Sequence, residues 1–206
     1  MSRKSHWRKR QHQEKYFQKA KDEGYRARSA YKLLQIQERF HIIRRGDVVV
    51  DLGAAPGSWS QVARKLVGDQ GRVIALDLEA IEPISGVTIL QGDMTAPDVR
   101  ARVIAAAGKQ ANMVLSDAAP ATSGIKLRDH VISMEVGHAA LAVARQLLQP
   151  QGNLVIKVFE GEDLPQLIRD VKRTFRRVKI HAPDASRKGS WETFIVARGY
   201  KGHKGA

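Results

Sequence analysis

Two ionisable side chains at the ends of apolar segments have residue types suited to proton transfer. Lys157 lies in the apolar run 155–159, where burying an ammonium is costly unless the amine is paired or neutral. Asp117 directly follows the apolar run 113–116. A desolvated lysine can act as a general base near neutral pH, whereas a nearby carboxylate favours the charged form. The sequence leaves both states open, and an isolated lysine in a strand is more commonly a snorkelling edge residue.

The segment 51–59, Asp-Leu-Gly-Ala-Ala-Pro-Gly-Ser-Trp, has the pattern of a ligand-binding loop. An expected strand ends near Asp51, and the small residues at 53–57 allow a backbone to approach a ligand closely before a helix begins. This arrangement is compatible with NAD as well as with S-adenosylmethionine. Asp77, at the end of the next expected strand, is placed to bind ribose hydroxyls in either case.

Three features favour S-adenosylmethionine as the cofactor. The loop lacks the G-x-G-x-x-G spacing that seats a pyrophosphate, and S-adenosylmethionine has no phosphate to seat. Gly92-Asp93 follows another expected strand, where a carboxylate can accept a hydrogen bond from an adenine amino group. The sulfonium is a cation, which suits a pocket edged by acids. These acids could instead form turns, and Trp59 could be a core aromatic. However, all of them fall at strand ends, where open α/β sheets bind ligands; they are Asp51, Asp77, Asp93 and Asp117.

From residue 47 onward, short β-branched runs alternate with longer amphipathic stretches, as is typical of βαβ units around a mostly parallel sheet. The helix expected before residue 148 should end there, because Pro150 and Gly152 follow. The pattern predicts helices at 28–40, 59–67, 96–107, 128–148 and 164–176. It predicts strands at 48–52, 72–77, 87–91, 113–116, 154–159, 178–181 and 193–197.

The charge of the chain is concentrated at its two ends. The 206 residues carry a net charge of +14, of which residues 1–32 contribute +8, residues 169–206 contribute +8 and the middle contributes −2. Clustered Lys and Arg bind phosphates by counterion release, so we expect a nucleic acid partner. Aromatic residues interleaved with the N-terminal basic residues could stack on unpaired RNA bases; they are Trp7, Tyr16, Phe17, Tyr25 and Tyr31.

Length and composition predict a basic N-terminal extension, partly disordered, at 1–24 and a single catalytic domain at 25–206. The chain has no cysteine, which excludes disulfides, iron–sulfur clusters and cysteine-ligated zinc. The histidine spacing indicates no metal site. No apolar run approaches the roughly 20 residues that cross a bilayer, and no signal peptide is recognisable. We therefore expect a cytoplasmic monomer that binds neither metal nor membrane.

Together, these motifs resemble the FtsJ/RrmJ family of ribose 2'-O-methyltransferases, and the resemblance runs from about residue 25 to 198. It rests on the segments 28–33, 51–59, 90–93, 115–117, 155–161 and 183–187, together with Glu192. It implies a Rossmann-like methyltransferase fold, with a seven-stranded, mostly parallel sheet, an antiparallel last strand and helices on both faces. It also implies the catalytic residues Lys32, Asp117, Lys157 and Glu192, and the cofactor-binding residues Gly57, Trp59, Asp77, Asp93 and Asp117. Ser58 replaces a second glycine common in the family loop.

The resemblance implies methylation of a ribose 2'-hydroxyl in RNA, namely a uridine in the A loop of 23S rRNA within the assembled large ribosomal subunit. Three alternatives stay open: methylation of transfer RNA, a non-catalytic RNA-binding role in ribosome assembly, and an NAD-dependent oxidoreductase. Methylation of base amines is disfavoured, because the Asn/Asp-Pro-Pro-aromatic stretch of those enzymes is replaced by Asp-Ala-Ala-Pro at 117–120. A cysteine-dependent mechanism is excluded by composition.

Overall fold

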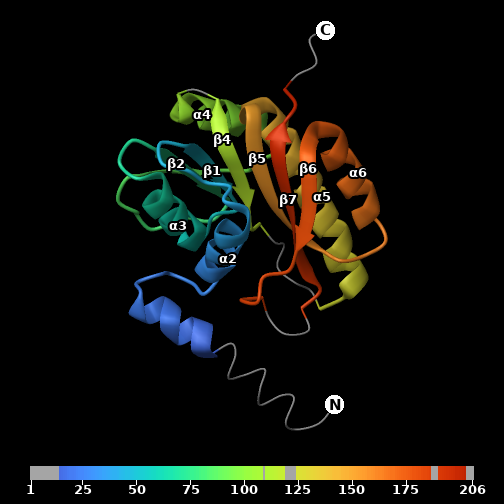
Figure 1. Ribbon diagram of the computed structural model, residues 1–206, viewed down its shortest axis with the longest axis horizontal. Coiled ribbons are helices and arrows are strands. Elements are labelled where there is room, and N and C mark those ends of the chain that lie inside the picture. The colour runs from blue at the N-terminus through green and yellow to red at the C-terminus, as the bar shows by residue number, and fades with distance from the viewer. Residues whose placement is uncertain (1–13, 109, 119–123, 187–189, 203–206) are drawn as a thin grey trace.

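A seven-stranded sheet forms the centre of the protein in the computed structural model, which describes residues 14–108, 110–118, 124–186 and 190–202 (Figure 1). The strand order is β3-β2-β1-β4-β5-β7-β6, and β7 runs antiparallel to both of its neighbours. This confirms the predicted α/β fold with its antiparallel last strand. The strands are β1 Val48–Leu52, β2 Arg72–Asp77, β3 Val87–Gln91, β4 Ala111–Ser116, β5 Leu148–Phe159, β6 Phe175–His181 and β7 Glu192–Tyr200.

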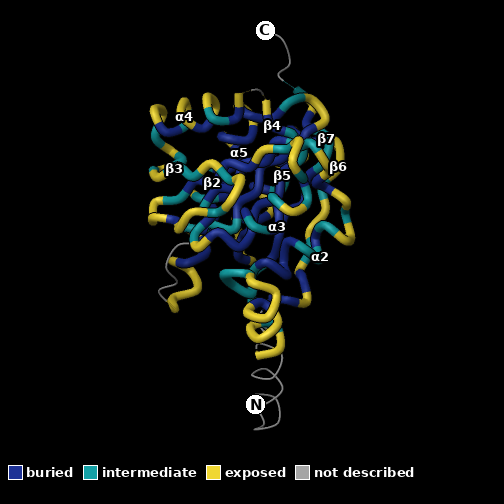
Figure 2. The backbone as a smooth tube through the Cα atoms, turned by 90° about the vertical axis from the view of Figure 1, so that its left-hand side faces the viewer, coloured by how far each residue is buried: buried dark blue, intermediate teal, exposed yellow. Residues whose placement is uncertain are grey.

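Helices cover both faces of the sheet, and strand alternation decides which face each core residue serves. In β1, Val48, Val50 and Leu52 pack into one core cluster with residues of α4, α5 and α6. Val49 points the other way and packs with residues of α2 and α3. Figure 2 shows the buried chain concentrated between these helical layers. The helices are α2 Ala30–Phe40, α3 Ser58–Val67, α4 Pro97–Ala107, α5 Lys126–Leu147 and α6 Leu164–Thr174.

Four strands begin earlier than the sequence pattern predicts, β4 and β7 by one or two residues and β5 and β6 by three or more. β5 starts at Leu148 rather than near 154, and its pairing with β4 jumps from Leu148 to Asn153, so the residues between leave the regular ladder. Pro150 and Gly152 lie in that irregular stretch. Because both residues are typical of loops, the sequence pattern does not indicate that β5 already pairs with β4 at Leu148. β6 starts at Phe175 rather than 178, because Phe175 is buried and pairs with Tyr200.

A helical segment at 14–22 packs against residues from later in the chain. Ala20 is buried against Tyr31 and Ala185, and the Tyr16 and Tyr31 rings lie 5.3 Å apart. Tyr31 is only 4% exposed, so its ring is not available to stack on a base, whereas Phe17 is 65% exposed. Residues 1–13, which include Trp7, lie outside the described residues.

Two features are absent from the described residues. No helix there combines the length and the apolar character that a bilayer crossing requires. Within the same residues, no group of three or more histidine, aspartate or glutamate side chains is arranged to hold a metal ion.

Candidate active site

A cavity of about 650 Å³ opens where β1, β2, β4 and β5 end at their carboxyl termini. This is the edge at which parallel α/β sheets bind ligands. Four of the residues predicted for the site line the cavity: Asp77, Asp93, Asp117 and Lys157. The hydrophobic part of the wall includes Leu78, which is 68% exposed.

Gly53 allows the loop after β1 to pass close to the loop after β4. It has φ +69°, and a Cβ atom at this position would lie 2.3 Å from the Ala118 Cβ. Only glycine therefore fits without a backbone shift. The loop is also held from the neighbouring strand, because the Gly53 and Ala54 amides both donate to the Leu76 carbonyl, at 2.8 and 3.1 Å.

The two acids at the outer part of the cavity accept backbone hydrogen bonds. Asp77 accepts from the Ala55 amide at 2.8 Å and from the Glu79 amide at 2.9 Å, so it links the cofactor loop to the end of β2. Asp93 accepts from the Thr95 amide at 2.7 Å, and this hydrogen bond lowers the pKa of Asp93. Asp93 therefore stays ionised and can accept a further hydrogen bond from a ligand.

Gly57 and Trp59 are not among the residues that line this cavity. Gly57 has φ +107°, and a Cβ there would lie 2.6 Å from the Ile84 side chain. The Trp59 side chain is 2% exposed, donates from Nε1 to the Ser29 carbonyl at 2.9 Å and stacks on Phe194. Because this indole is committed to the core, a cofactor could contact Trp59 only through its backbone. The cofactor-binding role of both residues stays a prediction.

Asp51 is fully buried at the end of β1, behind the cavity wall. Its Oδ2 accepts a hydrogen bond from Ser60 Oγ at 2.6 Å, while Oδ1 has no hydrogen-bond partner in the described part of the chain. Burial, together with the charges of Asp117 and Asp77, raises the pKa of Asp51 to about 7, against the opposing Ser60 hydrogen bond. Asp51 is thus a buried acid that is neutral at mildly acidic pH.

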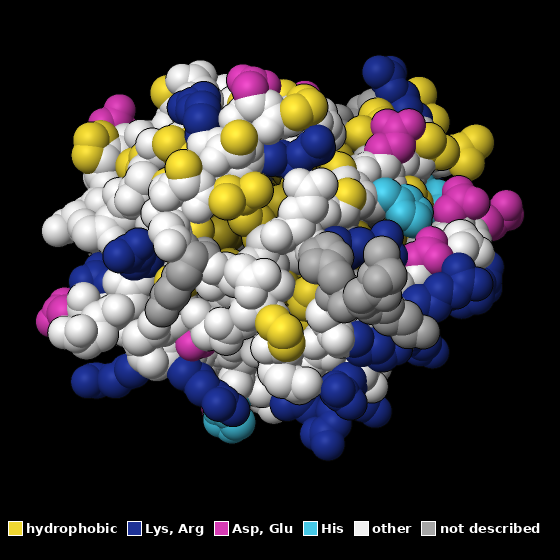
Figure 3. Space-filling view, turned by 90° about the horizontal axis from the view of Figure 1, so that it is seen from above, with side chains coloured by type: hydrophobic (Ala, Val, Ile, Leu, Met, Phe, Trp, Pro, Cys, Tyr) yellow, Lys and Arg dark blue, Asp and Glu magenta, His cyan; other side chains and the backbone are white. Residues whose placement is uncertain are grey.

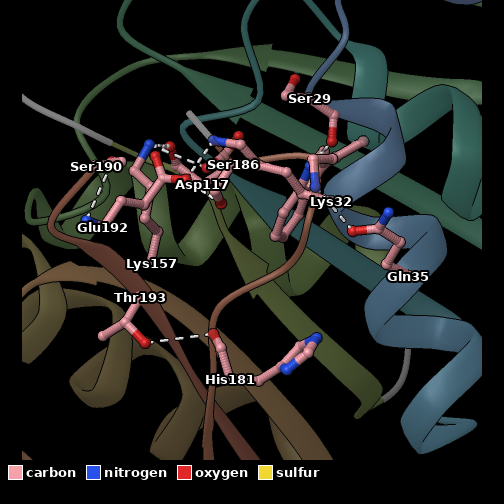
Figure 4. A network of polar contacts seen from close by, with 12 residues as sticks. Ser29, Lys32, Gln35, Asp117, Lys157, His181, Ser186, Ser190, Glu192 and Thr193 are labelled. Atoms are coloured by element: carbon pink, nitrogen blue, oxygen red, sulfur yellow. Dashed lines mark hydrogen bonds and ion pairs between the residues drawn. The ribbon is translucent and has the colours of Figure 1, made fainter. Parts of the chain in front are cut away.

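The four predicted catalytic side chains form two buried ion pairs (Figure 4). Lys157 Nζ donates to the backbone carbonyl of Asp117 and lies 3.0 Å from Asp117 Oδ1. Lys32 Nζ lies 2.7 Å from Glu192 Oε1. The side chains are between 9% and 16% exposed, so each charge relies on its partner.

Strand pairing brings the two ion pairs together. β5 and β7 pair with Phe159 opposite Glu192 and Lys157 opposite Phe194. Lys157 and Glu192 are therefore diagonal neighbours on one face of the sheet. The structure thus gathers Lys32, Asp117, Lys157 and Glu192 at one place, although Lys32 and Glu192 lie beside the cavity rather than in its wall.

Three further residues hold this arrangement, and the sequence reading gave them no role. Ser186 Oγ donates to Glu192 Oε1 at 2.8 Å, the same oxygen that pairs with Lys32. Gln35 Oε1 accepts from the Ala185 amide at 3.0 Å, which ties the loop before Glu192 to α2. The Lys32 ammonium also lies 5.7 Å from the Phe194 ring centre. Ser186 falls within the 183–187 motif, and this is the sequence feature that could have indicated its role.

Comparison with known proteins agrees with this geometry. The model of the FtsJ-like methyltransferase family matches residues 25–200. The chain belongs to that family. A "Ribosomal RNA large subunit methyltransferase E" from Methanothrix thermoacetophila is 50% identical over 189 residues, covering 92% of this chain and 73% of the relative. A protein of the same name from Pseudomonas fluorescens is 44% identical over 197 residues, covering 95% and 94%.

Solved structures show the same fold. A ribosomal RNA methyltransferase from Plasmodium falciparum superposes with a TM-score of 0.77 at 25% identity, over 87% of this chain and all of that chain. Fibrillarin from Aeropyrum pernix, which was solved with bound S-adenosyl-L-methionine, gives a TM-score of 0.58 at 15% identity, over 82% of this chain and 73% of that one. At this identity the second likeness shows the fold alone.

As a member of the FtsJ-like family, the protein is a methyltransferase that uses S-adenosylmethionine, and its cavity fits that group. The Asp117 carboxylate lies in the cavity wall, where Lys157 Nζ is 3.0 Å from its Oδ1. Asp77 and Asp93 supply further carboxylates around a space of about 650 Å³. When bound, the cofactor supplies a methyl group activated by a positively charged sulfur, and these acids suit that charge.

The buried acid generates a prediction about stability. The pKa of Asp51 is about 7 in the folded protein and 3.8 in the reference state. The folded state therefore holds the proton more tightly, and stability is lost as pH rises from about 4 to about 7. We expect Asp51→Asn to remove this loss, which is at most about 4 kcal/mol at 1.36 kcal/mol for each pH unit.

Urea unfolding of the ligand-free protein at pH 5 and pH 8 measures this effect. The free energy of unfolding of Asp51→Asn, relative to that of the native protein, should be higher at pH 8 than at pH 5. Asp69→Asn is the control, because the Asp69 side chain is 99% exposed and its variant should show no such rise. An equal stability difference at both pH values for Asp51→Asn would contradict the assignment of a raised pKa.

Proposed function

We propose that this protein methylates a ribose 2'-hydroxyl in large-subunit ribosomal RNA. The observation that carries the proposal is the convergence of Lys32, Asp117, Lys157 and Glu192 beside the cofactor cavity. The curated relatives named for ribosomal RNA methylation match the chain over nearly its whole length and support this substrate. At finer detail, we propose a uridine in the A loop of 23S rRNA, within the assembled subunit and hence in the cytoplasm. A monomeric state stays a prediction.

In the proposed reaction, the protein orients a weakly acidic hydroxyl and removes its proton. Lys157 is held by Asp117, through the backbone carbonyl and the carboxylate, and it faces the cavity. The Lys157 Nζ atom is bonded to Cε and contacts the carbonyl and the carboxylate of Asp117. One tetrahedral position of Nζ is therefore left for the substrate hydroxyl. The Lys157 amine would accept the proton of the 2'-hydroxyl, and bound S-adenosylmethionine would supply the methyl group that the 2'-oxygen takes in line.

Lys32 and Glu192 are proposed to position the ribose. They form a rigid pair one step along the sheet from Lys157, and Ser186 fixes the Glu192 carboxylate. In this proposal, their polar atoms contact the other sugar hydroxyls of a nucleotide whose 2'-oxygen lies at Lys157. Because the pair is mostly buried, its geometry is set before RNA arrives, which favours alignment of the hydroxyl.

Replacing the proposed base tests its role. We expect Lys157→Ala to lower kcat by about 10²- to 10⁴-fold, which is the usual contribution of a general base. Affinity for S-adenosylmethionine, measured by calorimetry, should be retained. Single-turnover transfer of labelled methyl groups to large ribosomal subunits measures the rate.

The matched control is Lys179→Ala, because Lys179 is also a lysine in a strand but is exposed on β6. That variant should keep the native rate. A loss smaller than tenfold in Lys157→Ala, with cofactor binding intact, would refute the assignment of Lys157 as base.

A double-mutant cycle separates the structural and catalytic roles of Lys32 and Glu192. Removing one partner leaves the other charge buried, so we expect Lys32→Met and Glu192→Gln each to destabilise the protein by about 1–3 kcal/mol. The double variant should recover part of this stability, measured by urea unfolding. Its methylation rate should nevertheless stay low if both groups position the ribose. A double variant with native activity would show that the pair is only structural.

The choice of RNA is tested by mapping ribose methylation after incubation with assembled large subunits, protein-free ribosomal RNA and transfer RNA. We expect 2'-O-methylation at one uridine of the large-subunit RNA, with assembled subunits as the best substrate. Modification of transfer RNA alone would support the transfer RNA alternative. Binding without methyl incorporation into any of the three RNAs would favour a non-catalytic assembly factor.

A further inference from the structure

The end of the sheet opposite the catalytic groups carries a second cavity of about 470 Å³. It lies at the amino ends of β4, β5 and β6 and at the carboxyl end of β7, together with the turn that leads into β1. Polar side chains dominate its wall. We call it the arginine hollow after four of its residues, Arg44, Arg176, Arg177 and Arg198.

Irregular backbone shapes the arginine hollow. The pairing of β4 with β5 skips from Leu148 to Asn153, so the chain between them bulges out as one wall. Gln151 in this stretch has φ +69°, a conformation that costs free energy for a residue other than glycine. Gly199 leaves space on the opposite side of the hollow. A Cβ atom at this position would lie 3.3 Å from both Arg176 Cδ and Gln151 Oε1.

The arginine hollow is positively charged and open to solvent. Arg44, Arg176 and Arg177 are exposed, while Arg198 donates to the Phe40 carbonyl at 3.2 Å. Within the described part of the chain, no salt bridge engages any of the four guanidinium groups. Asp47 is the acidic residue of the lining, and its carboxylate accepts a hydrogen bond from the Arg44 amide at 2.8 Å.

The wider surface around the hollow is also basic. Figure 3 looks onto this end of the molecule, and Lys and Arg side chains gather over its lower part and lower right margin. In the sequence, residues 169–206 contribute +8 to the net charge of +14. A field of one sign over a hollow concentrates ligands of the opposite sign.

The chemistry of the wall selects a phosphodiester. Guanidinium groups donate paired hydrogen bonds that match phosphate oxygens, and Gln149 and Gln151 add amide donors at the same wall. The Asn112 and Asn153 amides already bond the Val48 amide and the Ile42 carbonyl, so they shape the hollow rather than offer recognition. The lining includes no Phe, Tyr or Trp side chain, and His41 is its one ring, so guanidinium groups rather than stacking platforms dominate the wall.

We propose that the arginine hollow binds the phosphate backbone of a second segment of the RNA substrate, away from the nucleotide that is methylated. This inference rests on the proposed function in RNA methylation. Lys157 lies six positions after Gln151 in β5, which corresponds to at most about 20 Å at 3.3 Å for each step. A single nucleotide cannot reach both places, so the hollow acts only on RNA that is long enough to extend along the protein.

The test compares two variants that remove equal charge. Arg176→Gln/Arg177→Gln neutralises two exposed arginines of the hollow. Arg100→Gln/Arg102→Gln is the control, because these arginines lie on α4 and do not line the hollow. The probes are a labelled transcript of large-subunit ribosomal RNA and a labelled hexanucleotide, with affinity measured by fluorescence anisotropy over a series of salt concentrations.

For the transcript, we expect the hollow variant to lose about 5- to 50-fold in affinity and to lower the salt slope by about 1 to 2. Its affinity for the hexanucleotide and for S-adenosylmethionine should stay native. The control variant should bind the transcript within about twofold of the native protein. Arg44→Gln, on another wall, provides an independent variant with the same expected direction if the double variant unfolds.

Equal losses in the hollow and control variants, or a native salt slope in the hollow variant and in Arg44→Gln, would overturn the proposal. Native affinity of the hollow variant for the naked transcript would also overturn it, because the hollow would then make no contact with RNA. If the native enzyme methylates no ribosomal RNA, the proposed function fails. The binding comparison still reports on the hollow in that case.

Discussion

The antiparallel pairing of β7 with β5 is the constraint on which the catalytic arrangement depends. It places Glu192 on the same face of the sheet as Lys157, two positions along the ladder. A shift of one residue would turn Glu192 to the other face and leave Lys32 buried without its carboxylate. Since an unpaired buried charge costs several kcal/mol, the register that forms the site is also the register that the ion pairs stabilise. Topology and chemistry therefore reinforce each other.

The carboxylates at the ends of β1, β2 and β4 are accommodated in three different ways. Asp117 pairs with Lys157, and Asp77 accepts two backbone amide hydrogen bonds. Asp51 accepts hydrogen bonds from Ser60, and burial raises its pKa to about 7 despite them. An acid that holds its proton up to about pH 7 limits the repulsion among three neighbouring carboxyl groups. Enough negative charge remains at the cavity to suit a sulfonium.

Much of the fold follows from the sequence, because the first three strands are short apolar runs that end in polar residues. The bounds of β1, β2 and β3 match the expected ranges. The early start of β5 does not follow from the sequence, because Pro150 and Gly152 are typical of a loop. Of the catalytic residues, Asp117 and Lys157 stand out by their local setting. Lys32 and Glu192 were identified by resemblance, because only the β5–β7 register and α2 bring residues so distant in sequence together.

Other features depend on tertiary packing that no local pattern reports. Trp59 looks like a ligand-facing aromatic in its motif, yet its indole is held by Ser29 and Phe194 in the core. The arginine hollow combines residues from the turn before β1, from β6 and from β7. Sequence reading finds the basic C-terminal part but not its concave shape, which arises from the skipped pairing of β4 with β5.

The protein meets two opposite electrostatic demands by separating them along the strands. A cationic sulfonium requires acids at the cavity, whereas an RNA backbone requires basic groups, and acids at the cavity repel phosphates. The cavity acids and the arginine hollow lie at opposite ends of the sheet, about 20 Å apart along β5. At physiological ionic strength the Debye length is about 8 Å, so neither field cancels the other. The length of β5 thus allows one small domain to present a negative pocket and a positive surface at once.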